Sequence, residues 1–313
     1  MKIPDRYSLE NLLTALKRPS LVLSEANALG TKLNINLQDK LNYPSGTDIP
    51  GRDWDNLIIL DGCRYDMYAE HCNIEGELEK CRSSGSESWE FLQNNFQGEQ
   101  HHDTVYVTAN PHAPKLDSDT FHAVENLLDE YWDAEHQTVR PEDVADAAIE
   151  IYQEYPDKRL IVHFMQPHFP FIGDTGDDLE HKGIDLHREG RESTDAQVWM
   201  NLKYNRADKE LVWKAYRENL EVVLPHAERV MESIPGKTVI TSDHGNLLGE
   251  RTGPIPARGY GHPRGLHAEE LREVPWHVIE SSERRSITAD PPVNSEDLDS
   301  EIVEQRLDNL GYK

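Results

Sequence analysis

Short apolar runs alternate with amphipathic segments along most of the chain, and this pattern predicts an α/β fold. Runs rich in Val, Ile, Leu and Thr predict five buried strands, at residues 56–60, 104–108, 160–165, 238–241 and 274–279. Continuous apolar runs are typical of strands covered on both faces of a parallel sheet. We therefore expect a mostly parallel central sheet between helix layers.

Segments with apolar residues at helical spacing separate these runs. They predict helices at residues 89–96, 121–132, 141–155 and 208–234. Pro141 suits the first turn of the third helix, and Val144, Ala148 and Ile151 share one face of it. Pro225 lies inside the longest segment, where it predicts a kink or a break.

The pattern divides the chain into three parts. Residues 1–50 hold two short amphipathic segments, 9–16 and 24–33, and are expected to form a helical arm. Residues 51–285 form the main domain, which is interrupted by a polar insertion at 172–207. Such a long irregular segment is usually a lid, a binding loop or disorder. Residues 286–313 form a polar tail that ends in a predicted helix.

The charge balance narrows the range of partners. The chain has 32 basic and 58 acidic residues, a net charge of −26 spread over its whole length. This acidity opposes binding to nucleic acid or to an anionic membrane. It indicates a surface adapted to a high-salt cytoplasm of haloarchaeal type, with an ordinary acidic protein as the alternative.

Cysteine content and hydropathy bear on the compartment. Three cysteines are too few, and odd in number, for a disulfide framework. No apolar run approaches the ~20 residues of a membrane span, and the first residues lack the apolar segment of a signal peptide. We therefore expect a cytoplasmic protein without a membrane span.

Acidic and histidine residues stand where predicted strands end. Asp61 follows the first strand, and Asp243 and His244 follow the fourth; His262 comes later in a glycine-rich loop. The carboxyl ends of parallel strands share one edge of a sheet. Carboxylate and imidazole together suit zinc, manganese or iron. Gly245, directly after this pair, permits an unusual backbone angle.

Two serines precede the predicted helix at 89–96. A hydroxyl there lies at the positive end of a helix, where backbone N–H groups receive phosphate or sulfate, and a bound metal would turn it into a nucleophile. Ser88 is the first candidate and Ser86 its competitor. The alternative is a helix-capping box, because Ser-x-x-Glu also fits this segment.

Three further residues are candidates for the site. His168 lies beyond the third strand between prolines and is a candidate ligand of a metal or a substrate oxygen, whereas His163 inside that strand reads as a packing residue. Arg64 either neutralises the oxygens of a transferred group or pairs with Asp66 to fix the turn.

Together these segments resemble the alkaline phosphatase superfamily, in particular its sulfatase-like branch. The likeness rests on Leu60-Asp61 after the first strand, a hydroxyl at a helix start, Pro167-His168-Phe169-Pro170, Ser242-Asp243-His244-Gly245 and Val274-Pro275 in this order. It covers roughly residues 54–280.

The resemblance implies a hydrolase or transferase of phosphate, phosphonate or sulfate esters with one or two divalent metals (Zn, Mn, Mg or Ca). Asp61, Asp243 and His244 would be ligands, with His262 and His168 completing a second site or contacting the transferred group. Ser88 would be the nucleophile, and the substrate a small-molecule, glycan-linked or lipid-linked anionic ester.

The chain departs from sulfatases at two places. Gly62 stands where they have a second aspartate, and Cys81-Arg82-Ser83-Ser84-Gly85 lacks the Pro and Arg that accompany formylglycine formation. We therefore favour phosphate esters over sulfate esters. A non-catalytic protein that binds an anionic glycan or lipid is the other alternative.

The charge generates a first prediction. We expect the folded state to be more stable in molar NaCl or KCl than in dilute buffer, because the screening length falls from about 10 Å at 0.1 M salt to about 3 Å at 1 M. Thermal unfolding over this salt range, with saturating metal, measures the effect. A melting temperature that stays flat or falls would rule out adaptation to high salt.

Overall fold

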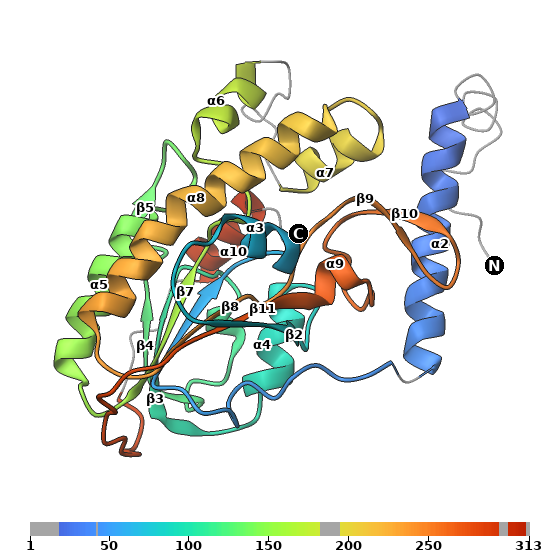
Figure 1. The fold of residues 1–313 in the computed structure, drawn as a ribbon. Helices are drawn as coiled ribbons and strands as arrows, with labels where there is room; N and C mark the ends of the chain where they lie inside the picture. The colour runs from blue at the N-terminus through green and yellow to red at the C-terminus, as the bar shows by residue number, and fades with distance from the viewer. Residues whose placement is uncertain (1–18, 42, 182–194, 294–299, 311–313) are drawn as a thin grey trace.

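We describe the fold from a computed structural model of the chain, which covers residues 19–41, 43–181, 195–293 and 300–310 (Figure 1). Its centre is a seven-stranded sheet in which β1 lies in the middle. Strand β11 pairs antiparallel with both of its neighbours, and the other pairings are parallel. In sheet order the strands are β2 (Glu77–Arg82), β11 (Glu273–Ile279), β8 (Thr238–Thr241), β1 (Asn56–Leu60), β7 (Arg159–Phe164), β3 (His101–Thr108) and β4 (Phe121–Asn126). The expected mostly parallel sheet is confirmed.

The two faces of the sheet are covered by different helices. Ile58 and Leu60 of β1 belong to a core shared with α3 (Tyr65–His71), α5 (Pro141–Glu154) and α8 (Lys209–Ser233). Leu57 and Ile59 belong to a second core, which includes Phe91 and Phe96 of α4 (Ser88–Phe96). Successive β1 residues are therefore buried on opposite faces, which explains why the strand is apolar at every position.

One helix expectation is wrong, and a second is narrowed. Residues 121–132 do not form a helix: Phe121–Asn126 is strand β4, and Trp132–Asp133 is β5, which pairs with β6 (Thr138–Val139). The edge of β3 supplies backbone partners for β4, and Phe121 packs on Phe96 at a ring distance of 5.2 Å. Helix α8 continues through Pro225, so the chain is not broken there.

The polar insertion contains two helices among its described residues. Helix α6 (Asp174–His181) precedes residues 182–194, which lie outside the described part, and α7 (Asp195–Lys203) follows them. Helix α7 contacts β10 of the hairpin formed by β9 (Leu247–Thr252) and β10 (Ala257–Gly261). The remaining short elements are η2 (Ala113–Lys115), α9 (Glu269–Arg272) and α10 (Ser300–Asn309).

Helix α2 (Pro19–Lys40) stands beside the β9–β10 hairpin at one end of the molecule (Figure 1). Its contact face is polar: the Asn34 amide donates to the Ile255 oxygen at 2.8 Å and accepts from the Ile255 nitrogen at 2.7 Å. Its exposed face carries Leu29, Leu33 and Leu37. The predicted helix at 24–33 lies within α2, whereas the one at 9–16 lies outside the described residues.

None of the helices in the described ranges is both long and apolar enough to span a membrane.

The Asn34 contacts give a second prediction. Asn34→Ala leaves two backbone groups of Ile255 without their partner and should cost about 1–3 kcal/mol locally. Hydrogen exchange should then speed up in α2 and in the β9–β10 hairpin, while the central strands keep their protection. Asn36→Ala is the control, because the exposed Asn36 amide bonds only within the helix, to the Lys32 oxygen. Equal exchange in both variants would contradict this packing.

Candidate metal centre

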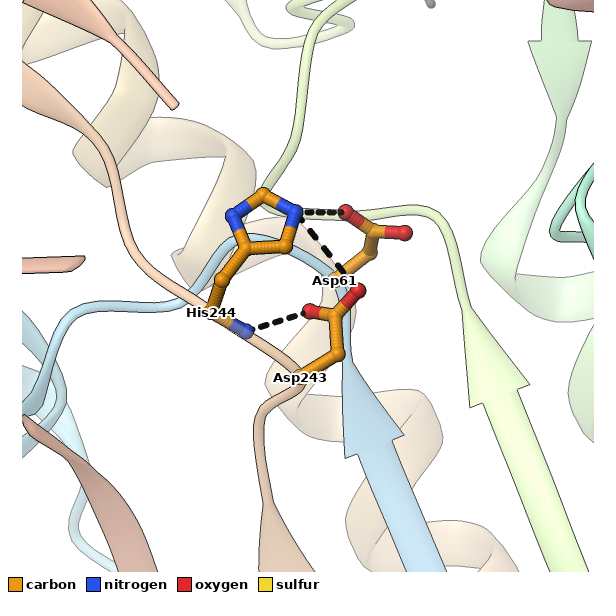
Figure 2. A group of neighbouring side chains, drawn as sticks. All are labelled: Asp61, Asp243 and His244. Carbon is orange, nitrogen blue, oxygen red and sulfur yellow. Dashed lines mark hydrogen bonds and ion pairs between the residues drawn. The ribbon is translucent and has the colours of Figure 1, made fainter. Parts of the chain in front are cut away.

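The centre forms where β1 and β8 end. These strands are parallel neighbours, with Ile59 paired to Thr241. Two residues beyond that pair, Asp61 and Asp243 leave the sheet at the same level, and His244 follows directly. All three side chains are fully buried, and they point toward one another (Figure 2).

The donor atoms converge on one small volume. His244 Nε2 lies 3.6 Å from Asp61 Oδ1 and 3.6 Å from Asp243 Oδ2. One ligand atom from each residue can be chosen so that all three lie within 4.8 Å of one another. This spacing suits a single ion bonded to all three, because ligand bonds to zinc are about 2.0–2.2 Å long.

Asp243 has its two oxygens in different situations. Oδ1 accepts the backbone N–H of Gly62 at 2.9 Å and of His244 at 2.8 Å, which fixes the carboxylate plane. Oδ2 is buried and has no hydrogen-bond partner. No Lys or Arg of the described chain forms an ion pair with Asp243. A buried carboxylate oxygen left in this way fits a cation ligand.

His244 is prepared as a neutral ligand. Its Nδ1 lies 2.9 Å from the Gly245 oxygen, a contact that requires the proton on Nδ1 and leaves the Nε2 lone pair facing the carboxylates. Burial, with His262 adding to it, lowers the pKa of His244 well below its usual value. The imidazole is therefore available as a metal ligand at neutral pH.

Ser88 lies against this cluster from α4. Its Oγ donates to Asp61 Oδ2 at 3.2 Å and lies 3.3 Å from His244 Nε2. The Ser88 hydroxyl does not cap the helix, because the carboxylate of Glu87 accepts from Trp89 N and Glu90 N. The first turn therefore does not offer these two N–H groups to a phosphate, contrary to our expectation for this helix start.

Ser86 points elsewhere. Its Oγ donates to Glu90 Oε2 at 2.7 Å and accepts from Gly265 N at 2.8 Å. Glu90 Oε2 also accepts from Ser86 N, so this pair completes the N-terminal capping network of α4. The hydroxyl that contacts the acidic cluster is that of Ser88.

His168 and His262 form a second group of donors. Their Nε2 atoms are 3.2 Å apart, and the His262 ring centroid is 4.7 Å from that of His244. Nδ1 of His168 lies 2.7 Å from the Phe169 oxygen, which places the proton there and leaves Nε2 with a lone pair. Two imidazole nitrogens face each other next to the three-residue cluster.

The structure adds two residues that the sequence analysis did not place in the site. His163 Nε2 is buried without a hydrogen bond, 3.5 Å from Asp61 Oδ2 and 3.9 Å from Asp243 Oδ2. Burial lowers the pKa of His163 to about 4, although the Asp243 carboxylate opposes the shift. Asn110 donates from Nδ2 to Asp61 Oδ2 at 2.7 Å.

Arg64 is held in the turn after β1. Its guanidinium bonds to both oxygens of Asp66, at 2.9 and 2.5 Å, and to Glu250 at 3.1 Å. It also stacks on Trp213, with Cζ 5.0 Å from the ring centroid. These contacts engage the guanidinium within the turn and the neighbouring hairpin.

Two glycines shape the backbone around the ligands. Gly62 has φ +66°, and a Cβ there would lie 2.9 Å from Asn246 Nδ2. A second aspartate in that position would be strained, which accounts for its absence. Gly245 has no positive φ, and a Cβ there would lie 2.2 Å from the Glu270 oxygen.

Comparisons with known proteins complete the description. No family model matches the chain, and no curated protein matches it. Among solved structures, the C-terminal periplasmic domain of EptC from Escherichia coli, in complex with Zn, is similar over 76% of this chain and 77% of its own, with 12% identity and a TM-score of 0.46.

Two further structures are similar to this chain. Lipooligosaccharide phosphoethanolamine transferase A from Neisseria meningitidis matches over 79% of this chain and 53% of its own (12% identity, TM-score 0.46). An alkaline phosphatase superfamily protein from Vibrio parahaemolyticus matches over 77% and 63% (12% identity, TM-score 0.39).

The donor set generates a third prediction. Chelator-treated protein should gain stability on addition of Zn²⁺ or Mn²⁺, by about 2.7 kcal/mol when free metal reaches ~100 times its dissociation constant. Thermal unfolding and elemental analysis measure the gain and the stoichiometry. Asp243→Asn should remove most of both, whereas Asp129→Asn, an exposed change of the same charge, should not. Equal metal content in the two variants would exclude Asp243 as a ligand.

Proposed function

We propose that the chain is a metal-dependent hydrolase or transferase of phosphate esters with Ser88 as its nucleophile. The observation that supports this most directly is the position of the Ser88 hydroxyl, within 3.3 Å of both Asp61 and His244. A hydroxyl buried beside two carboxylates and a neutral imidazole is suited to activation. In this proposal residues 51–285 form the catalytic domain, with an arm before it and a tail after it.

Asp61, Asp243 and His244 would hold one divalent metal, and His168 and His262 would complete a second site or contact the transferred group. Imidazole ligands favour zinc or manganese over magnesium or calcium. When bound, such an ion lowers the pKa of a coordinated hydroxyl and neutralises charge on the phosphate oxygens. Four of these residues are buried, and His262 is half-buried. This burial keeps bulk water away from the ligands.

The protein's own residues then define the steps. Asp61 Oδ2 accepts the Ser88 hydroxyl hydrogen in the resting site and is placed to take that proton. Ser88 Oγ forms a bond to phosphorus as the ester P–O bond breaks, and the leaving oxygen takes up a proton from solvent. Attack by water on the phosphoserine gives hydrolysis; attack by a second alcohol gives transfer.

His163 and Asn110 would act as positioning residues. The Asn110 amide donates to Asp61 Oδ2 at 2.7 Å, and His163 Nε2 lies 3.5 Å from the same oxygen. Tyr106 contacts His163 Nδ1 at 2.8 Å and orients its ring.

The insertion provides the surface nearest to the second donor group. Trp199 of α7 is buried against Gly261, where a Cβ would lie 3.0 Å from Trp199 Cδ1. Gly261 directly precedes His262, so α7 packs against the loop that carries this histidine. We therefore assign substrate selection, for a small-molecule, glycan-linked or lipid-linked anionic ester, to the insertion.

Substitution of the two serines tests the nucleophile and forms the fourth prediction. With metal bound, Ser88→Ala should lower turnover of p-nitrophenyl phosphate by about 10³-fold or more while metal content stays within error. Ser86→Ala is the matched comparison and should retain most activity. If the loss appears in Ser86→Ala instead, the nucleophile is Ser86.

The same assay separates the alternatives. An aryl sulfate turned over faster than the aryl phosphate would make sulfate esters the substrate class. A stoichiometric metal with no turnover of phosphate monoesters, diesters or aryl sulfates would favour a binding protein. Unchanged activity in both serine variants would replace the covalent route by direct attack of a metal-activated water.

A further inference from the structure

A cavity of about 460 Å³ lies outside the metal centre, where the end of α2, the β9–β10 hairpin and α9 meet. Its volume falls in the ~300–1,000 Å³ range of small-ligand pockets. Three arginines and a histidine line it: Arg82, Arg251, Arg272 and His267. This is an unusual concentration of cationic side chains in a chain with a net charge of −26.

Arg272 carries the inference. It is 3% exposed, its Nε donates to the Ser83 oxygen at 2.8 Å, and its Nη1 lies 3.0 Å from His267 Nδ1. No carboxylate of the described residues lies within 4.0 Å of this guanidinium; in electrostatic terms the nearest acid is Glu90, which bonds to Ser86. A buried charge without a counter-ion is costly, and a bound anion would remove that cost.

The other charged groups at the cavity support an anion rather than a cation. Arg82 and Arg251 form no ion pair with any described carboxylate, in common with Arg272. Of the three glutamates at the rim, Glu273 is paired with Lys80 at 2.7 Å, and the charge of Arg64 acts on Glu270. Glu269 is exposed.

A second cavity, of about 530 Å³, is also lined by Arg272 and His267. It lies between residues 45–48 and α4, so the Arg272–His267 pair borders open space on two sides. The polar ends of this pair are therefore reachable by a ligand although Arg272 itself is buried.

We propose that the cavity lined by Arg82, Arg251, His267 and Arg272 binds a phosphate group. The planar guanidinium fork matches the oxygens of phosphate, and flanking cations suit its double charge. This site is separate from the proposed catalytic function and does not require a metal.

The site is connected to the metal centre through one residue. Ser83 donates its backbone N–H to the Arg272 backbone oxygen at 2.8 Å. Its hydroxyl donates to the backbone oxygen of Asp243. Ser83 Oγ also accepts from Gly85 N at 3.1 Å, in the loop that leads to Ser88. A phosphate bound to Arg272 would therefore lie next to Ser83, which bonds both to Asp243 and to the loop that precedes Ser88.

Equilibrium dialysis with labelled inorganic phosphate tests the site in the full chain and forms the fifth prediction. With excess chelator, which removes metal-dependent binding, we expect one phosphate site per chain. Arg251→Gln and Arg272→Gln should each weaken it about 10-fold or more, the loss of a charge-assisted hydrogen bond. Arg251→Gln keeps the test valid should Arg272→Gln fail to fold, because Arg251 is exposed.

Arg258→Gln is the matched control. Arg258 is also exposed, stands opposite Arg251 in the same hairpin and donates to the Gly249 oxygen outside the cavity. It should change phosphate affinity less than about 2-fold. The proposal is overturned if chelated wild-type protein binds no phosphate, or if Arg258→Gln weakens binding as much as Arg251→Gln, which would indicate a non-specific charge effect.

A kinetic arm distinguishes a free phosphate from a second phosphate on the substrate. If the site takes free phosphate, Arg251→Gln should leave the KM of p-nitrophenyl phosphate and of a bisphosphorylated ester unchanged in phosphate-free buffer. If it takes a substrate phosphate, the KM of the bisphosphorylated ester alone should rise about 10-fold. Either pattern, together with the dialysis result, supports a phosphate site; a rise in both KM values would assign Arg251 to the catalytic pocket and overturn the separate site.

Discussion

Two buried carboxylates at the edge of a parallel sheet impose the main constraint on this structure. The pairing of Ile59 with Thr241 brings Asp61 and Asp243 out at one level, beside His244. Like charges this close in a low-dielectric interior raise the free energy of the folded state unless a cation or hydrogen bonds offset their repulsion. Hydrogen bonds from neighbouring groups partly offset the repulsion: Gly62 N donates to Asp243, and the Asn110 amide donates to Asp61.

The sequence was informative where a single local rule decided the outcome. The apolar run 56–60 is buried on both faces, so it could be recognised as a central strand, and the residue that follows it had to lie at the sheet edge. Asn110 lies two residues beyond the end of β3, so it reaches the same sheet edge without directly following a strand. A position inside a strand indicates a packing residue, and the sequence gives no other signal for His163. In the structure, its pairing with Ile59 and the contact of its Nδ1 with Tyr106 turn Nε2 toward the carboxylates.

Other features depend on contacts between distant segments and left no local signal. Residues 121–126 form a strand because the edge of β3 is available to them, whereas their own spacing also fits a helix. Helix α2 reverses the usual rule of amphipathic helices. It faces the hairpin with Asn34 and Gln38, which bond to backbone groups there, and exposes leucines. A hydrophobic pattern alone would have placed the opposite face inward.

The segment 83–88 shows how one short stretch serves several purposes. Three of its serine hydroxyls have different partners. Ser83 donates to the backbone oxygen of Asp243, Ser86 donates to Glu90 in the cap of α4, and Ser88 donates to the carboxylate of Asp61. Because Glu87 supplies the cap, the Ser88 hydroxyl does not compete for backbone N–H groups. The bonds of Ser83, Ser86 and Glu87 therefore fix the loop, and the Ser88 hydroxyl faces Asp61 and His244, as the proposed nucleophilic role requires.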